Sequence, residues 1–158
     1  FDLNSEKSNK NYEKFNTKNY QKYVDGNLSK IKFDYENEKL PDLTEIISLS
    51  KTAYKRFLQK KNELGIKLNT DIYVEIYDTL IKIPKEDDEN FETIKKSSIN
   101  KNSKYIIYKT DPRLLKMLLM GPRYAHWNNA EIGSHIRFFR NPNVYERNIW
   151  GSMCYFHN

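Results

Sequence analysis

The stretch HWNNAEIGSHIRFFR, residues 126–140, contains two histidines, two adjacent asparagines, a glutamate and two arginines. Gly133 divides it, because the residues before the glycine follow a helical pattern and those after it alternate as in a strand. On the strand side, Ile136 and Phe138 fall on one face and Arg137 falls on the other. We therefore predict a helix-to-strand junction, which separates the two histidines.

The residues before this junction predict one long helix. Asp42 is suited to cap a helix over residues 43–64, because Glu45 stands three positions on and apolar residues recur at helical spacing. Gly65 then stops the helix. We expect the lysines of this helix, Lys61 among them, to face the solvent.

Short segments of alternating pattern follow the helix. The first, DIYVEIYD, alternates Ile72, Val74 and Ile76 with tyrosine or polar side chains, which predicts a half-buried strand. The strands predicted after it cover residues 80–83, 91–97 and 104–108. Because these segments succeed one another directly, we expect an antiparallel meander. The acidic residues 86–89 are expected to form a turn or loop and not a calcium-binding loop.

The C-terminal third predicts more helix and one more strand. TDPRLLKMLLMG, residues 110–121, predicts a helix that ends at Gly121, since Thr110 or Asp111 can cap it, a proline suits the first turn and leucines form a stripe. A short helix over residues 125–132 and a strand over SHIRFFR follow. A closing amphipathic helix is predicted from apolar residues at helical spacing, which are Tyr145, Ile149, Met153 and Phe156.

These elements predict an α+β domain over residues 41–158, with a mainly antiparallel sheet of about five strands packed against helices. Residues 1–40 are rich in Asn, Lys and Ser and lack sustained periodicity, so we expect a linker or flexible N-terminal arm. The chain begins with Phe1 and not with methionine, and we expect it to be a piece of a longer protein.

Composition narrows the classes of function. The 158 residues include 27 Lys and Arg against 21 Asp and Glu, a net charge of +6, but the basic residues are interspersed with acids. Nucleic-acid binding is therefore not expected from net charge alone. The single cysteine, Cys154, excludes an internal disulfide and fits a reducing cytoplasmic location. The sequence has no apolar run long enough to span a membrane.

Arginine is distributed unevenly along the chain. Most arginines fall in a C-terminal region of a chain that otherwise uses lysine, and arginine is preferred where planar, multi-donor pairing matters. They are Arg113, Arg123, Arg137, Arg140 and Arg147. Nucleic-acid binding through this arginine cluster is therefore an alternative function, with an affinity that falls steeply with salt.

Several motifs resemble known families. The order of helix, strands, two short helices, strand and helix resembles the sterol-carrier-protein-like α+β fold, with parallels in residues 110–121, in NNAEIG leading into SHIRFFR, and in MCYFH. HWNNAEIGSHIRFFRNPNVYER, residues 126–147, also looks like the C-terminal region of metallo-β-lactamase-fold proteins. Those proteins are related to hydroxylases of the nucleotide sugars CMP-N-acetylneuraminate and UDP-N-acetylmuramate. The resemblance covers residues 41–158 at most and is sharp from Thr110 onward.

The resemblance implies an accessory role. The H-x-H-x-D-H cluster of a metallo-β-lactamase domain and the paired Cys and His ligands of a Rieske centre do not occur in this sequence, so we expect no cofactor here. The implied function is a non-catalytic domain that binds an apolar or nucleotide-sugar-like ligand or mediates association, for example as a homo-oligomer. The implied partner is an upstream catalytic domain of the same polypeptide.

A second class of function is an enzyme. A stand-alone metal-dependent hydrolase would use His126, Glu131 and His135, but their spacing does not match the i, i+3 or i, i+4 pairing of helical ligands. A nuclease would use His135, Asn148 and His157, without the hairpin that such sites require. We therefore expect no catalytic residue and no metal site.

The polar residues of the junction are first expected to be structural, with Trp127 anchoring the helix and Arg137 or Arg140 pairing with Glu131 or Glu146. If the region binds a ligand or partner, the contacts are expected from Arg123, His126, Trp127, Asn128, Asn129, Glu131, His135, Arg137 and Arg140. An apolar cleft would be lined by Met117, Met120, Phe138, Trp150 and Phe156.

Overall fold

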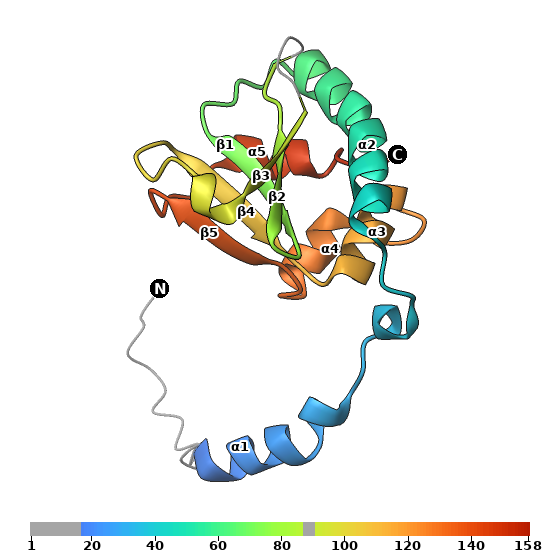
Figure 1. Ribbon diagram of the computed structural model, residues 1–158. Helices are drawn as coiled ribbons and strands as arrows, with labels where there is room; N and C mark the ends of the chain where they lie inside the picture. Colours follow the sequence, from blue (N-terminus) through green and yellow to red (C-terminus); the bar gives the residue numbers. More distant parts are fainter. Residues whose placement is uncertain (1–16, 87–90) are drawn as a thin grey trace, which may run out of the picture. The chain divides into compact units, whose positions relative to one another are not determined.

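The computed structural model describes residues 17–86 and 91–158. The chain divides into two compact units, residues 1–34 and residues 35–158. Most of the predicted acidic turn at residues 86–89 lies outside the described residues. The elements of both units are labelled in Figure 1.

The first unit is short and carries exposed apolar side chains. It contains helix α1 (Thr17–Gly26) and the 3-10 turn η1 (Leu28–Lys30). Tyr20, Tyr23 and Ile31 each expose half or more of their surface.

The second unit begins at Tyr35, before the expected domain start at residue 41. The 3-10 turn η2 (Asp34–Asn37) lies at this start. Arg113 Nη1 donates to the Glu36 carbonyl at 2.7 Å, and the Tyr35 hydroxyl lies 3.2 Å from His135 Nδ1. These contacts attach the first residues of the unit to its C-terminal half.

Helix α2 (Leu43–Glu63) confirms the predicted long helix. Asp42 Oδ1 accepts from the Glu45 backbone N–H at 2.7 Å, which satisfies one unpaired donor of the first turn. The apolar stripe through Ala53 and Phe57 is fully buried. The prediction for Lys61 is wrong: its side chain is 3% exposed, and its ammonium group is 3.0 Å from the Glu86 carboxylate.

The predicted strands form one five-stranded sheet in the order β3-β2-β1-β4-β5. Its strands are β1 (Asp71–Ile76), β2 (Thr79–Ile83), β3 (Glu92–Lys95), β4 (Tyr105–Lys109) and β5 (Arg137–Asn141). The α+β class and the mainly antiparallel sheet packed against helices are confirmed.

Two details of the strand predictions are wrong. The fourth strand does not continue the meander, because β4 pairs in parallel with β1 and places Glu75 beside Lys109. β1 is not half-buried, since Tyr73 and Glu75 are 5% and 6% exposed. As the central strand, β1 is covered on both faces.

The remaining helices follow the predicted order. They are the helices α3 (Pro112–Met120), α4 (Trp127–Ile132) and α5 (Arg147–Met153). The turn η3 (Lys96–Ser98) was not predicted and takes the place of the end of the strand expected over residues 91–97. The closing helix is shorter than predicted: Tyr145 precedes it and is 59% exposed, whereas Phe156 follows it and is fully buried. In the described part of the chain, no helix is long and apolar enough to cross a membrane.

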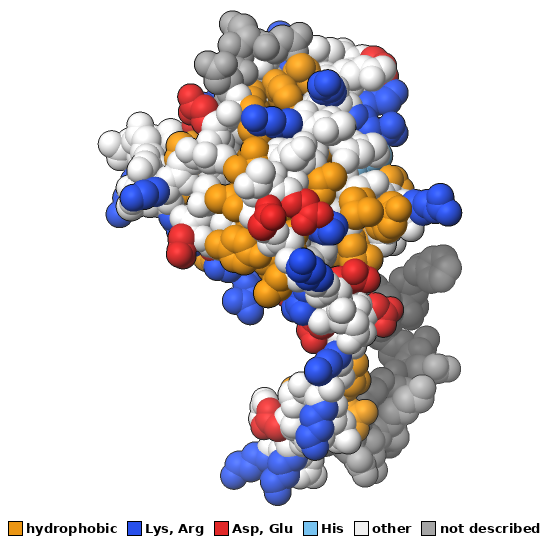
Figure 2. All heavy atoms as spheres, turned by 45° about the vertical axis from the view of Figure 1, so that its right-hand side comes forward, with side chains coloured by type: hydrophobic (Ala, Val, Ile, Leu, Met, Phe, Trp, Pro, Cys, Tyr) orange, Lys and Arg blue, Asp and Glu red, His pale blue; other side chains and the backbone are white. Residues whose placement is uncertain are grey.

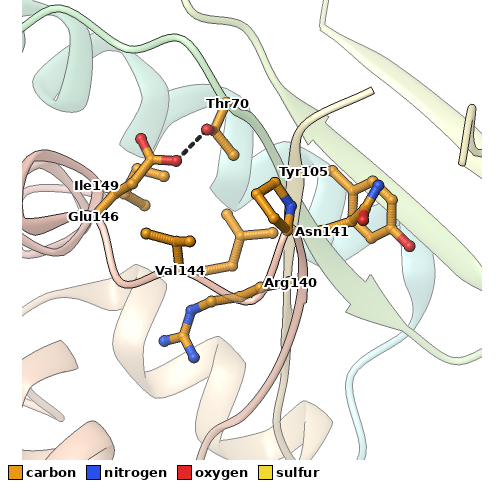
Figure 3. A pocket seen from close by; sticks show the side chains of 9 residues that line it. Thr70, Tyr105, Arg140, Asn141, Val144, Glu146 and Ile149 are labelled. Carbon is orange, nitrogen blue, oxygen red and sulfur yellow. Dashed lines mark hydrogen bonds between the residues drawn. The ribbon is translucent and has the colours of Figure 1, made fainter. Parts of the chain in front are cut away.

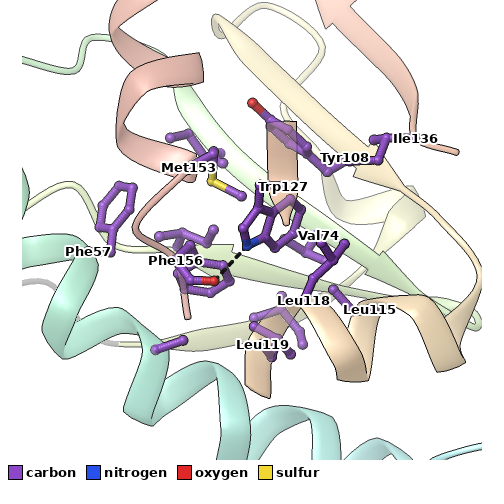
Figure 4. Packing of buried hydrophobic residues seen from close by; sticks show 14 of the residues in the cluster. Phe57, Val74, Tyr108, Leu115, Leu118, Leu119, Trp127, Ile136, Met153 and Phe156 are labelled. Carbon is purple, nitrogen blue, oxygen red and sulfur yellow. Dashed lines mark hydrogen bonds between the residues drawn. The ribbon is translucent and has the colours of Figure 1, made fainter. Parts of the chain in front are cut away.

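The two faces of the sheet differ in what covers them. The helix-covered face carries Ile72, Val74 and Ile76, which belong to the main core with buried residues of α2, α3, α4 and α5 (Figure 4). The opposite face carries a smaller cluster of Tyr73, Leu80 and Ile107, against which Ile94, Ile99 and Tyr105 pack. The candidate site residues are divided between these two faces.

Candidate functional site

The junction at residues 126–140 lies on the helix-covered side. Trp127 is buried and its indole N–H donates to the Phe156 carbonyl at 2.8 Å (Figure 4). The Trp127 ring also packs edge-on against Tyr108, with ring centroids 6.0 Å apart. Trp127 therefore anchors α4 to the sheet, as the structural interpretation predicts.

Gly133 ends α4 for a reason other than backbone freedom. Its φ of −73° is open to any residue, so a left-handed conformation is not required. A Cβ at this position would lie 3.0 Å from the Asn129 carbonyl and 2.8 Å from the His135 ring. The glycine is needed because the chain passes so close to the end of the helix.

The histidines are separated, as predicted. His126 is exposed at the start of α4, whereas His135 lies against Tyr35, with ring centroids 5.7 Å apart. Within residues 17–86 and 91–158, no group of three or more His, Cys, Asp or Glu side chains could hold a metal ion. His126, Glu131 and His135 thus do not converge on a metal site. Of the nuclease set, Asn148 is exposed and donates to the Lys67 carbonyl.

A group of polar side chains lies between α4, α5 and the sheet. Burial raises the pKa of the Glu131 carboxyl, although Arg140 and a hydrogen bond with Trp150 act in the opposite direction. Burial likewise raises the pKa of the Cys154 thiol, which donates to the Asn128 side-chain carbonyl. These shifts favour the neutral forms, so the group is suited to holding the helices on the sheet and not to supplying a nucleophile.

The two strand arginines lie on opposite faces, as predicted. The Arg140 guanidinium lies 4.6 Å from the Phe138 ring centroid on the helix-covered side, where its charge also acts on Glu131. Arg137 pairs in register with Lys109 on the opposite face. Of the two strand arginines, Arg140 is thus the one whose charge acts on Glu131.

The other three arginines of the C-terminal region lie on other elements than Arg137 and Arg140. Arg113 binds the Asp111 carboxylate through its Nε and Nη2 atoms, at 2.9 Å and 2.7 Å. Arg123 is exposed in the loop between α3 and α4, and Arg147 is exposed at the start of α5. Figure 2 shows one side of the molecule, on which basic side chains are scattered among acidic and apolar ones. The arginine cluster of the sequence is thus not a single surface.

Two of the five residues predicted to line an apolar cleft belong to the core or pack against it. Phe156 is fully buried, with its ring 5.9 Å from that of Phe57, and the Phe138 ring is 5.0 Å from that of Tyr108. Met117, Met120 and Trp150 are partly buried. Phe156 is therefore a packing residue and not part of an open cleft.

A small cavity lies beside the turn after β5. It has a volume of about 10 Å³, the size of a single water molecule. Arg140, Val144 and Ile149 contribute to its lining, and the Thr70 hydroxyl donates to Glu146 on one wall (Figure 3). The cavity is too small for an organic ligand.

A much larger cavity lies at the carboxyl ends of the parallel strands β1 and β4, and we call it the strand-end cavity. Its volume is about 560 Å³. It is lined by Glu75, Tyr77, Asp78, Thr79, Lys95, Lys96, Ser97 and Lys109. A further cavity of about 400 Å³, near the end of α2, is also bordered by charged side chains, including Lys61 and Glu86.

Glu75 is the central charged group of the strand-end cavity. Its side chain is 7% exposed, and its two oxygens pair with the ammonium groups of Lys96, at 2.8 Å, and Lys109. Burial alone would raise the pKa of Glu75, but the hydrogen bonds from Lys109 and Lys96 outweigh it, so the pKa lies below its usual value. The carboxylate therefore remains ionised at neutral pH and holds both lysines in place.

None of the residues that line this cavity is among the predicted site residues. The signal in the sequence is Glu75 itself, an acid in the middle of the strand DIYVEI. The alternating pattern predicts only that Glu75 faces the solvent from a half-buried strand. Lys96 and Lys109 are distant from Glu75 in sequence, and only the pairing of β4 with β1 and the turn after β3 bring them to it.

No protein-family model matches the chain, and no curated protein and no solved structure matches it. The resemblance drawn from residues 110–157 therefore stays a prediction, and the chemistry of the site is inferred from the side chains themselves.

Proposed function

We propose that this chain is a non-catalytic accessory domain, with a sterol-carrier-like fold, of a larger metallo-β-lactamase-fold protein. We further propose that it binds an anionic, nucleotide-sugar-like ligand and not an apolar one. The observation that carries this proposal is the contrast between a closed apolar core and an open, lysine-lined cavity.

The hydrogen bonds that tie the junction to the rest of the fold support a non-catalytic role. Trp127, Cys154 and Thr110 each donate a hydrogen bond within the fold, to Phe156, Asn128 and His135 respectively. Side chains engaged in this way are not presented to a substrate. The order of helices and strands on which the sterol-carrier resemblance was drawn also recurs in the structure, which supports the proposed fold relationship.

The close packing of the core and the charge of the strand-end cavity support an anionic ligand. Core residues such as Leu115, Leu118 and Phe156 are fully buried, so an apolar ligand would have to open the packing between sheet and helices. The strand-end cavity, by contrast, carries three lysines against two carboxylates. Lysine ammonium groups are suited to phosphate and carboxylate oxygens.

Equilibrium binding to the full chain tests this proposal. UDP-N-acetylglucosamine serves as the nucleotide-sugar probe in titration calorimetry, and cis-parinaric acid serves as the apolar probe in fluorescence titration. We expect saturable, salt-sensitive binding of the nucleotide sugar and no enhancement of parinaric acid fluorescence. Binding of parinaric acid alone would contradict the anionic assignment. Turnover of the nucleotide sugar in the presence of Zn²⁺ would contradict the non-catalytic one.

A further inference from the structure

We propose that the strand-end cavity is a phosphate-binding site in which Lys96 and Lys109 contact the phosphate oxygens and Lys95 adds positive charge at its border. This inference rests on the proposed function, since it assigns the anionic ligand to one site and names the group that is recognised. It concerns residues that no motif in the sequence identifies.

Two segments far apart in the sequence bring the lysines together. Lys109 is the last residue of β4, and it pairs with Glu75 near the end of the parallel strand β1. Lys95 is the last residue of β3, and Lys96 begins the turn η3 that follows it. Strand pairing fixes the backbone positions of the lysines, and Glu75 holds the ammonium groups of Lys96 and Lys109 before any ligand binds, which lowers the entropic cost of binding.

Glu75 positions the lysines without using all of their hydrogen-bonding capacity. An ammonium group has three N–H donors, and Lys96 and Lys109 each give one to Glu75. Their side chains remain 51% and 44% exposed, so the remaining donors are accessible to a ligand. Glu75 is thus a positioning residue, and the lysines are the binding residues.

The charges of the cavity fit a phosphate group. The lining has three lysines against Glu75 and Asp78, which gives 3 − 2 = +1. Phosphate brings negative charge and several acceptor oxygens, and the hydroxyls of Thr79 and Ser97 supply further donors beside the lysines.

Stability alone does not account for Glu75. Placing a carboxylate in the central strand has a desolvation cost, and an apolar side chain of similar volume is often as stable or more so. Ion pairs with half-exposed lysines offset only part of this cost. An arrangement that is unfavourable for packing, beside a large cavity, is expected where the charges serve binding.

An aromatic ring extends the site in one direction. Lys96 Nζ lies 5.3 Å from the centroid of the Phe139 ring, which is 46% exposed. A planar base could pack on this ring while the phosphate contacts the lysines. The ligand class is therefore a nucleoside phosphate, with the phosphate group as the required part.

Titration calorimetry of the full chain tests the site, with inorganic pyrophosphate, UDP and uridine as probes. We expect UDP to bind most tightly, pyrophosphate to bind, and uridine not to bind. The double variant Lys96→Gln, Lys109→Gln is expected to weaken UDP binding by roughly tenfold or more. The matched control, Lys51→Gln with Lys55→Gln on the exposed side of α2, removes the same charge and should leave binding unchanged.

Two further measurements keep the result interpretable if the double variant folds poorly. Lys95→Gln removes one positive charge at the border of the cavity without disturbing the contacts of Glu75, and it should weaken UDP binding less than the double variant does. In the wild-type chain, pyrophosphate should shift the backbone amide NMR signals of Ser97 and Thr79.

The outcomes separate this inference from the proposed function. If UDP binds but neither the lysine variants nor the amide signals respond, the site is wrong and the anionic-ligand function stands. If none of the three probes nor the nucleotide sugar binds, both proposals fail. If pyrophosphate binds as tightly as UDP, the phosphate site is supported and the role of Phe139 is refuted.

Discussion

Two glutamates on opposite sides of the sheet have pKa values displaced in opposite directions. Glu131, on α4, lies beside the helix-covered face, where burial raises the pKa of its carboxyl. Glu75 lies on the opposite face, where two lysine ammonium groups outweigh burial and lower the pKa. Burial thus disfavours the charged form of one glutamate, whereas ion pairs favour the charged form of the other.

The difference shows that the two faces of one sheet use their polar groups differently. The helix-covered face has many apolar neighbours, and its polar groups are used to join helices to strands. The opposite face has a small apolar cluster, and its charged groups surround a cavity. Because successive residues of a strand point to opposite faces, Val74 packs in the apolar core while the adjacent Glu75 lines the cavity.

The largest expected effect contrasts two phenylalanines, one on each side. Phe156→Ala should lower the free energy of unfolding by about 3–5 kcal/mol, because the side chain is fully buried between Phe57 and Trp127. The control, Phe139→Ala on the opposite face, should cost about 1 kcal/mol or less because the ring is 46% exposed. Urea denaturation measures both, and equal losses would refute the division between the faces.

The next effect concerns Glu75. Its pKa is lowered in the folded state, so it contributes stability above the ordinary value of 4.5, and this is lost as the pH falls through the folded pKa. Glu75→Gln should therefore lower the free energy of unfolding by about 1–2 kcal/mol at pH 7, and by less at pH 3. Urea denaturation at both pH values checks this, and a pH-independent loss would contradict the ion pairs.

A smaller effect distinguishes the two strand arginines. Arg140→Ala removes the contact with the Phe138 ring and the charge beside Glu131, and it should cost about 1 kcal/mol. Arg137→Ala, on the opposite face, should change stability by no more than about 0.5 kcal/mol. Thermal unfolding of the two variants gives the comparison. The reverse order would mean that Arg137 is the structural residue.

The smallest effect concerns Glu131 and has the opposite pH dependence to that of Glu75. Its folded pKa is raised, so its contribution to stability is fully present below 4.5 and is lost as the pH rises through the folded pKa. Glu131→Gln should match the wild type at pH 4 and be more stable at pH 7, by a few tenths to about 1 kcal/mol. Guanidinium denaturation at both pH values checks this. A variant that is less stable at pH 7 would show that Arg140 outweighs burial.

Much of the fold could be predicted from local sequence. The cap at Asp42, the stripe through Phe57 and the division at Gly133 place helices and strands close to where the structure has them. These predictions succeed because hydrogen bonds within a few residues and the period of apolar side chains determine such elements. The structural role of Trp127 was also predictable, because a large apolar side chain at the start of a helix is expected to pack on a neighbouring element.

The candidate cavity could not be predicted in this way. The sequence by itself determined which segments are helices and strands, and that Arg137 and Arg140 lie on opposite faces. Only the tertiary structure decided that β4 pairs in parallel with β1, that Lys61 is buried, and that Glu75 meets its lysines. Local periodicity gives the face on which a side chain lies, but the partner strand and its register depend on contacts between residues far apart in sequence.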